Sequence, residues 1–392
     1  MGVIIILLAT LFLIISNVIK NEATKQKVQT FIFEKAGGEI EYESMLIYLL
    51  PSPHINVFNG DFSIPGKLDA KFKTLVVYPK IFSLLRGKLE IGEIRLLNTE
   101  IKLMTTDRTF HKEEKELIIS SDDIKKGIRK ALGYLHDNEQ GLNVRVVNGS
   151  FSLLESSDTL LTLENTQATL SLPNGILNFN ITSDSNIWNR IIARGNMDTS
   201  SFEGAANLKL NAFTPHELLD LFKYDFELVK DSLIDIDVDI RTDNLDSADF
   251  HIEGDVKKLT LVKNQKEIDL SARDIDADIS VDPHETHIKL NNAVFLYPKL
   301  SVSGRYDIST DKGRHELFLS GSGVNVDQAR ESTLLIAGEE KAVRILFEIV
   351  KGGTVPDITL SASGNSFKDM WRNEGYEING KMVNGSIFIP GA

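Results

Sequence analysis

The sequence contains no cysteine among its 392 residues. Disulfide bonds, thiolate metal sites and cysteine nucleophiles are therefore excluded, and the chain can reside in an oxidising compartment without protection. Tryptophan is also scarce, with only Trp188 and Trp371. A carbohydrate-binding β-module needs aromatic platforms, so the shortage of tryptophan and the absence of clustered tyrosines disfavour that class.

Basic residues are fewer than acidic ones, because 43 lysines and arginines stand against 56 aspartates and glutamates, for a net charge of -13. An acidic surface repels phosphate backbones, and no cluster of lysine and arginine is dense enough to reverse this repulsion locally. We therefore expect no nucleic acid partner. Hydrophobic residues make up 42% of the chain, which is enough to bury a substantial core.

Sequence motifs of the common enzyme classes are missing. There is no G-x-S-x-G, H-E-x-x-H, Walker or dinucleotide-binding fingerprint. The nearest approach to a metal pair is His284 and His287 in the polar segment DPHETH, where no third ligand is evident, so solvated side chains are expected. We expect a protein that is not an enzyme, with no catalytic residues, no metal site and no cofactor.

One long apolar run, Gly2 to Ile19, carries no charged residue. As a helix with a rise of 1.5 Å per residue it would be about 27 Å long, which is close to the thickness of a bilayer core. No basic segment precedes the run and no A-x-A cleavage site follows it, which favours an uncleaved anchor over a signal peptide. We expect a transmembrane anchor at residues 1–20 whose apolar members include Val3, Ile6, Leu8, Leu11, Leu13, Ile15 and Ile19.

Apolar residues recur at every second position over much of the chain after residue 38, which is the periodicity of β-strands. Asn98, Asn148 and Asn384 each follow an apolar residue and precede a further apolar run, so each is expected to form a turn that breaks one strand and starts the next. Strands therefore dominate the predicted secondary structure.

Three segments have helical spacing instead, with an apolar stripe along one side. The third is expected to be one helix that ends at Gly352-Gly353. The predicted fold class is thus mainly β with a few amphipathic helices. The predicted helices are residues 122–136, 214–226 and 328–351.

The segment Ile234 to Ile240, IDIDVDI, has an aspartate at every second position. As a strand it has one apolar face and one acidic, solvated face, and it lacks the glycine-containing loop spacing of a calcium site. The apolar face needs cover from a second sheet, a helix or a bound apolar ligand, because an exposed patch of that extent is costly. From the residues alone, a closed sandwich and an open groove are equally consistent with the pattern.

Residues 52–103 form the run SPHINVFNGDFSIPGKLDAKFKTLVVYPKIFSLLRGKLEIGEIRLLNTEIKL, which contains a strand pattern, a glycine-bearing loop, a second strand pattern and an "LLxGxixIxxixLxxpxixL" block. In this order the run resembles the N-terminal part of the AsmA-like family of bacterial envelope proteins, which includes the TamB and YhdP types. A second resemblance covers Arg344 to Pro390, where LFEIVKGGTVPDITLSASG and INGKMVNGSIFIP look like the helix and hairpin units of larger members. Such members usually run much further, so the resemblance implies an N-terminal portion.

The resemblance implies an elongated, curled antiparallel β-sheet whose concave apolar face accommodates lipid acyl chains. On that basis the expected regions are an anchor at 1–20, a helical stalk at 21–38, an AsmA-like β-region at 39–120, and β-groove regions at 121–215 and 216–392. The expected lining positions are the apolar members of the predicted strands. They are Leu89, Ile91, Ile94, Leu96, Ile101, Leu103, Leu208, Leu210, Ile234, Ile236, Val238, Ile240, Ile275, Ile279, Val281, Leu300 and Val302.

The expected function is that of a single-pass inner-membrane protein with its bulk in the periplasm. Lys20, Lys25 and Lys27 follow the apolar run, so the positive-inside rule would place the bulk in the cytoplasm, but the resemblance implies the periplasm and large domains translocate largely regardless of such charges. The expected partners are the membrane, phospholipid or another lipid, and other envelope proteins. The expected role is phospholipid transport or outer-membrane lipid homeostasis. The alternative is a scaffold or chaperone that assists assembly of outer-membrane or surface proteins.

Overall fold

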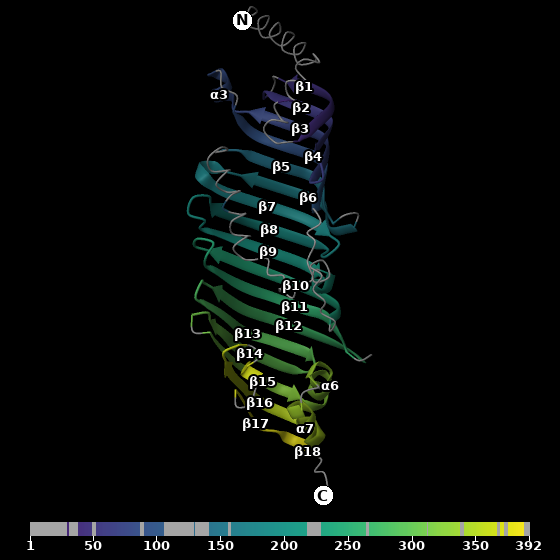
Figure 1. Cartoon of the computed structure of the whole chain (residues 1–392), viewed down its shortest axis with the longest axis vertical. Helices are drawn as coiled ribbons and strands as arrows, with labels where there is room; N and C mark the ends of the chain where they lie inside the picture. The colour runs from purple at the N-terminus through teal and green to yellow at the C-terminus, as the bar shows by residue number, and fades with distance from the viewer. Residues whose placement is uncertain are drawn as a thin grey trace, which may run out of the picture. The chain divides into compact units, whose positions relative to one another are not determined.

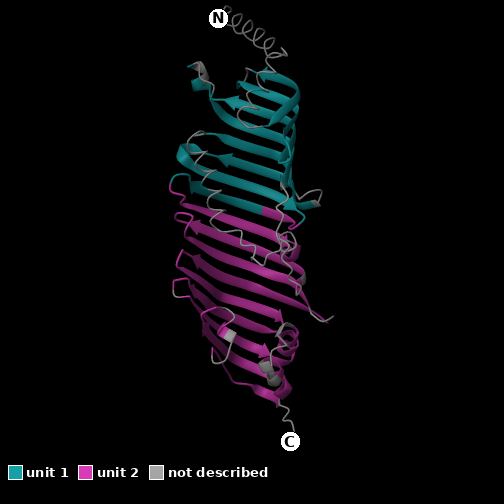
Figure 2. Cartoon of the chain, viewed as in Figure 1, with its two compact units in different colours: residues 1–186, 192–200 teal, residues 187–191, 201–392 magenta. Residues whose placement is uncertain are grey.

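A computed structural model describes residues 30, 38–48, 52–86, 90–105, 129, 141–155, 158–217, 229–263, 266–311, 313–337, 341–366, 369–371 and 375–387. The predicted mainly-β fold with few helices is confirmed, because strands dominate the described residues (Figure 1). The chain divides into two compact units, Met1–Asn186 with Ile192–Ser200 and Ile187–Ile191 with Ser201–Ala392 (Figure 2). We call them the first and the second unit and describe each by itself.

Strands β1 to β7 form the sheet of the first unit. Its elements are β1 (Glu39–Tyr48), β2 (His54–Ile64), β3 (Leu68–Pro79), α3 (Ile81–Leu85), β4 (Ile91–Thr105), β5 (Asn143–Glu155), β6 (Asp158–Ser171), η1 (Pro173–Gly175) and β7 (Ile176–Ser185), followed by β8 (Arg190–Asp198). The prediction that all strands would be antiparallel is wrong at one place, because β4 and β5 are parallel. Residues 106–142 connect them, and a connection of that length can return the chain to the starting edge, as a parallel pair requires.

The asparagines that were expected to form turns lie inside strands. Asn98 in β4 and Asn148 in β5 have φ angles of 48° and 55°, and the side-chain amide of Asn148 donates a hydrogen bond to Oδ1 of Asn98 at 2.6 Å. Register pairing is interrupted at both residues and resumes beyond them without a register shift between β3, β4 and β5. Asparagine tolerates the left-handed backbone conformation at these two positions better than most residues do. The asparagine signal therefore marks positive-φ positions inside strands rather than strand ends.

The second unit contains an antiparallel sheet from β9 to β18. Consecutive strands pair as far as β16, which then pairs with both β17 and β18. From β10 to β15 neighbouring strands are joined by short connections, and the strand register places the apolar positions of one strand opposite those of the next. The strands are β9 (Gly204–Phe213), β10 (Val229–Thr242), β11 (Ala248–Lys263), β12 (Lys266–Val281), β13 (Glu285–Tyr297), β14 (Leu300–Ser309), β15 (Arg314–Asn325), β16 (Val350–Gly364), β17 (Tyr376–Gly380) and β18 (Val383–Ile387).

The helix predicted over residues 328–351 is two helices, α6 (Val326–Ala337) and α7 (Lys341–Ile349), and η2 (Asp369–Trp371) is a short 3-10 turn. Gly338 follows α6 directly in the sequence, which is the usual place for a helix-ending glycine. Gly352 and Gly353 were expected to end the helix, but they lie within β16. The apolar spacing continues from one helix into the next, so the sequence pattern predicted a single helix.

The remaining helical predictions fall largely outside the described residues. Residues 215–217 are helical, as predicted for the start of the segment 214–226, whereas 218–228 and all of 122–136 except Arg129 lie outside. The predicted anchor, including Val3, Ile6, Leu8, Leu11, Leu13, Ile15 and Ile19, and all of the stalk except residues 30 and 38, also lie outside. In the described part of the chain, no helix combines the length and apolarity needed to cross a bilayer.

Two buried clusters stabilise the units. In the first, Ile40, Tyr42, Val57 and Phe72 pack together across β1, β2 and β3 with 7% to 9% of each side chain exposed. In the second, Leu335 of α6 packs on Leu261 of β11 and Ile268 of β12, with 5% to 7% exposed. Burial of such side chains contributes roughly 1.5–3 kcal/mol each. Helix α6 therefore covers one end of strands β11 and β12.

Candidate functional site

A continuous apolar row crosses nine strands of the second unit, from β9 to β17. Residues that face each other in the strand register point to the same side of the sheet, so the register defines the row. Each residue of this central row is the register partner of the next. The central row is Leu208, Val238, Ile252, Ala277, Leu290, Gly304, Leu319, Leu360 and Ile378.

A second row lies two residues away along each strand and therefore on the same face. It is also without charged residues over nine strands. The second row is Ala206, Ile240, Phe250, Ile279, Ile288, Tyr306, Leu317, Ala362 and Tyr376. We call the surface made by the central and second rows the apolar face.

The dimensions of the apolar face follow from strand geometry. Nine strands give eight gaps of about 4.8 Å, so each row is about 38 Å long. One leaflet of a bilayer has a hydrocarbon thickness of about 15 Å, half of the roughly 30 Å core. The rows are therefore more than twice as long as the depth that a lipid acyl chain occupies in its leaflet.

The apolar face is only half-buried. Every residue of the central row is partly exposed, and Ile378 is 54% exposed. In the second row only the small residue Ala362 is buried, at 6% exposed. By contrast, Leu261 and Ile268, at the end of β11 and β12 that α6 covers, are 5% and 7% exposed. Among the described residues, no second sheet pairs with this face, which favours the open arrangement over the closed sandwich.

The opposite face of the same strands is charged and wet. Asp237 of β10 accepts hydrogen bonds from Asn207 at 2.7 Å and from Lys209, both on β9. Lys258 binds Asp231 at 2.7 Å, with the side chains 46% and 41% exposed. Surface ion pairs of this kind contribute about 0–1 kcal/mol each, so they keep the outer face soluble more than they hold the fold together. We call this side the outer face.

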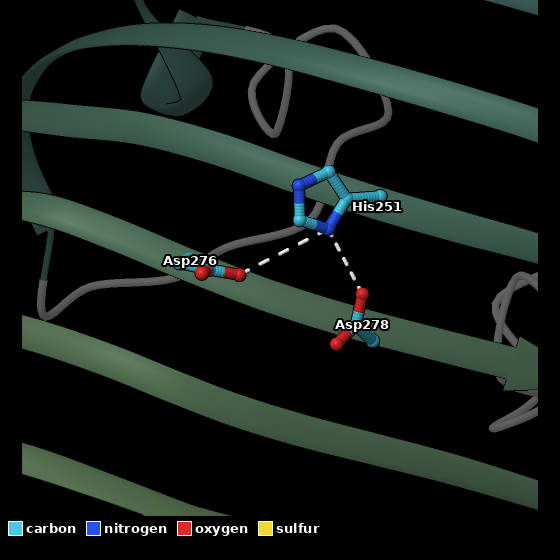
Figure 3. Close-up of side chains that lie close together, drawn as sticks. All are labelled: His251, Asp276 and Asp278. Atoms are coloured by element: carbon cyan, nitrogen blue, oxygen red, sulfur yellow. Dashed lines mark hydrogen bonds and ion pairs between the residues drawn. The ribbon is translucent and has the colours of Figure 1, made fainter.

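Three outer-face residues, His251 of β11 and Asp276 and Asp278 of β12, bring their side chains together (Figure 3). Nδ1 of His251 lies 2.9 Å from a carboxylate oxygen of Asp278 and 3.9 Å from one of Asp276. The hydrogen bond with Asp278 raises the pKa of His251. The side-chain amide of Asn291 donates a hydrogen bond to Asp276 at 2.9 Å and another to Asp278 at 2.7 Å. The hydrogen bonds from Asn291 and His251 lower the pKa of Asp278. The ligand atoms are close enough to hold one cation, but the two carboxylates already accept these N–H groups, so the cluster is a hydrogen-bond and ion-pair network.

His284 and His287 bind separate carboxylates. Nδ1 of His284 lies 3.0 Å from Asp311, and the two ring nitrogens of His287 lie 2.7 Å from Asp307 and 3.1 Å from Glu285. These hydrogen bonds raise the pKa of both histidines. The two side chains are 68% and 51% exposed. His284 lies in the turn between β12 and β13 and His287 lies on the outer face of β13, so both side chains are solvated.

The predicted lining residues of the second unit share one face. Val238 and Leu208 belong to the central row and Ile240 and Ile279 to the second row. The others lie at alternate positions on the same strands and are also partly exposed. They are Leu210, Ile234, Ile236, Ile275, Val281, Leu300 and Val302.

In the first unit, the predicted lining residues lie on β4. Ile94 and Leu96 align with Val144 and Val146 of β5, and Ile101 and Leu103 align with Phe151 and Leu153. The positive φ angle at Asn98 lets the two halves of β4 keep their apolar residues on one face although the numbering changes from even to odd. Ile91 is 38% exposed at the start of the strand. Leu89 lies outside the described residues.

Sequence reasoning missed several members of the apolar face. Phe250 and Ile252, Ile288 and Leu290, and Leu317 and Leu319 were not among the predicted positions. The first two pairs alternate with polar residues, as in IKLNN, which is the correct signal over a short length, whereas Leu317 and Leu319 flank the apolar Phe318 and show no alternation. Strand register is what connects these short pairs into a long row, and register cannot be read from one strand alone.

Compared with known proteins, the chain matches no family model, no curated protein and no solved structure. The resemblance of residues 52–103 to the AsmA-like family therefore stays a prediction.

Proposed function

We propose that this protein binds the acyl chains of lipids along the apolar face of its second unit. The observation that carries the proposal is the central row, an uncharged and partly exposed ladder over nine strands with a charged face behind it. An apolar surface of that extent favours an apolar ligand, because exposing it to water is costly.

The binding needs no reactive group. Each methylene that is moved from water to an apolar surface contributes about 0.8 kcal/mol, and this interaction has no preferred direction. An acyl chain can therefore shift from strand to strand without losing directional bonds. Polar headgroups would remain in water at the margins of the face, where the strands end in polar loops.

The proposed setting rests on the predicted anchor and on the resemblance of residues 52–103 to the AsmA-like family. Residues 2–19 would anchor the chain in the inner membrane, and the acidic outer face would keep the body soluble in the periplasm. In this setting the proposed role is phospholipid transport or outer-membrane lipid homeostasis, carried out by binding and movement rather than by catalysis.

The experiment is lipid analysis of residues 21–392, purified from cells without detergent. Native mass spectrometry and lipid extraction would measure how much phospholipid accompanies each chain, and circular dichroism would check that the sheet is folded. We expect phospholipid in stoichiometric amount. A folded body free of lipid would contradict the proposal.

A further inference from the structure

Exposed apolar side chains gather at one end of strands β1 to β4 in the first unit. Phe82 is 80% exposed, more than any other large hydrophobic residue described, and Ile81 beside it is 48% exposed. Both lie on α3, which follows β3 directly (Figure 1). Leu46 and Tyr48, at the end of β1, are 36% and 39% exposed. A group of exposed apolar side chains at one place is unfavourable on a surface that contacts only water.

An aromatic row crosses β1, β2 and β3 at this end of the strands. The ring of Tyr48 stacks on His54 of β2 with centroids 4.8 Å apart, and His54 lies 5.1 Å from the ring of Tyr78 on β3. The guanidinium of Arg95 lies 4.6 Å above Tyr78. These side chains alternate with Ile47, Ile55 and Val77, so they lie on the face opposite to the apolar residues of the first unit. The row is a separate surface.

Hydrogen bonds hold α3 in place. The backbone N–H of Lys80 donates to the carbonyl of Glu90 at 2.7 Å, and the hydroxyl of Ser83 donates to the Glu90 carboxylate at 2.8 Å. These bonds fix α3 to the segment before β4, and Ile81 and Phe82 are exposed on the helix held in this way. The exposed position of Phe82 is therefore set by the fold.

We propose that this surface, which we call the interfacial patch and define as Leu46, Tyr48, Tyr78, Ile81 and Phe82, inserts into the headgroup region of a lipid bilayer. Tyrosine and arginine prefer the membrane–water boundary, where a ring can be apolar at one end and hydrated at the other. Phenylalanine and isoleucine reach below that boundary. The proposal rests on the proposed anchor at residues 2–19, but not on lipid binding by the second unit.

The tether makes the bilayer the apolar surface within reach. Residues 20–38 separate the predicted anchor from β1, and even when fully extended they span at most about 65 Å. A patch of five residues is small, but a tethered unit meets the bilayer at a high effective concentration. The patch would then orient the first unit on the membrane.

Charge contributes little to this contact. Arg95 is paired with Glu93 at 2.6 Å, and Lys80 lies 4.0 Å from Glu90. The rim of the patch is therefore nearly neutral. We expect insertion into uncharged phosphatidylcholine vesicles and little effect of salt, since screening acts on charges and not on apolar contact.

The absence of cysteine allows a clean test, because a single introduced thiol is the only one in the chain. The full chain carrying Arg86→Cys would be labelled with an environment-sensitive fluorophore at the end of α3, so that Ile81 and Phe82 remain intact. It would be reconstituted into phosphatidylcholine vesicles that contain spin-labelled phosphatidylcholine as a quencher. A matched control, Lys67→Cys, places the same label at the exposed turn before β3, about 36 Å away along the strand.

We expect the label at position 86 to shift to shorter wavelength and to be quenched, and the label at position 67 to do neither. Adding Phe82→Ser to the Arg86→Cys chain should abolish the shift, and an 80% exposed side chain can be removed without loss of the fold. An unquenched label at position 86 in vesicles that carry the chain would overturn the proposal. A shift that depends on protein concentration and not on vesicles would overturn it in favour of a protein contact. Failure of the chain to float with vesicles would overturn the anchor, and the patch proposal with it.

Discussion

Replacing Leu290 by aspartate places a carboxylate in the middle of the central row. Its register partners there are Ala277 and Gly304, which have small side chains or none. Neither register partner is large enough to cover the new charge. Because Leu290 is only half-buried, the carboxylate can keep water around it, and the strand can still form.

The size of the effect follows from the row spacing. A hydrated carboxylate on one strand would interrupt apolar contact over about 4.8 Å, and an extended acyl chain covers that distance with about four methylenes at roughly 0.8 kcal/mol each. The binding free energy would fall by about 3 kcal/mol, which corresponds to roughly a hundredfold in affinity.

The assay is the amount of phospholipid that co-purifies with residues 21–392, together with binding of a fluorescent fatty acid. The matched control is Lys289→Asp, which changes the neighbouring residue on the outer face. It alters the net charge by two instead of one, so a general charge effect would weaken binding more in the control.

We expect loss of lipid with Leu290→Asp and normal lipid with Lys289→Asp, with circular dichroism unchanged in both. Equal lipid binding by the two folded variants would refute the assignment of the apolar face.

Three further predictions concern stability and ionisation. Gly304→Ala should lower the free energy of unfolding by about 1–3 kcal/mol in urea titration, because the added Cβ would collide with a backbone carbonyl oxygen of β15. Gly92→Ala should cost less, because its nearest contact would be a flexible lysine methylene at 3.3 Å and the nearest backbone atom would lie at 3.5 Å. Asn148→Ala should destabilise the first unit by about 1–2 kcal/mol because alanine disfavours positive φ, and Asn148→Gly should cost less. Equal losses would contradict the explanation from the positive φ angle. In an NMR titration the pKa of His251 should lie above its ordinary value of 6.5, and Asp278→Asn should lower it. The stabilisation that comes from the raised pKa of His251 is complete below the pKa of this histidine in the unfolded chain, and it is lost as the pH rises through the folded-state pKa.

Strand content could be predicted from the sequence because alternation is a local property. The segment IDIDVDI already separated an apolar from an acidic face, and the register places Val238 and Ile240 on the apolar face as predicted. The presence of helices near residues 328–351 was also predicted, since their apolar stripe is local. The break after Ala337 was missed because the stripe continued on both sides of it.

Features that depend on distant residues could not be predicted in the same way. The contact of His251 with Asp278 joins positions 27 residues apart, and only the pairing of β11 with β12 brings them together. The parallel pairing of β4 with β5 depends on the path of a long connection. The choice between a closed sandwich and an open face depends on which other elements pack over the strands, and the sequence of a strand alone does not predict that.

The most direct test of the central claim is site-specific photo-crosslinking of the full chain in cells. A photoreactive residue would replace Val238 on the apolar face or, as the control, Asp239, the next residue on the outer face. Mass spectrometry would identify the adducts. Lipid binding along the apolar face predicts a lipid adduct at position 238 and none at position 239. Protein adducts at position 238 without lipid would contradict the account and favour a chaperone for envelope proteins, and equal lipid labelling at both positions would contradict a face-specific site.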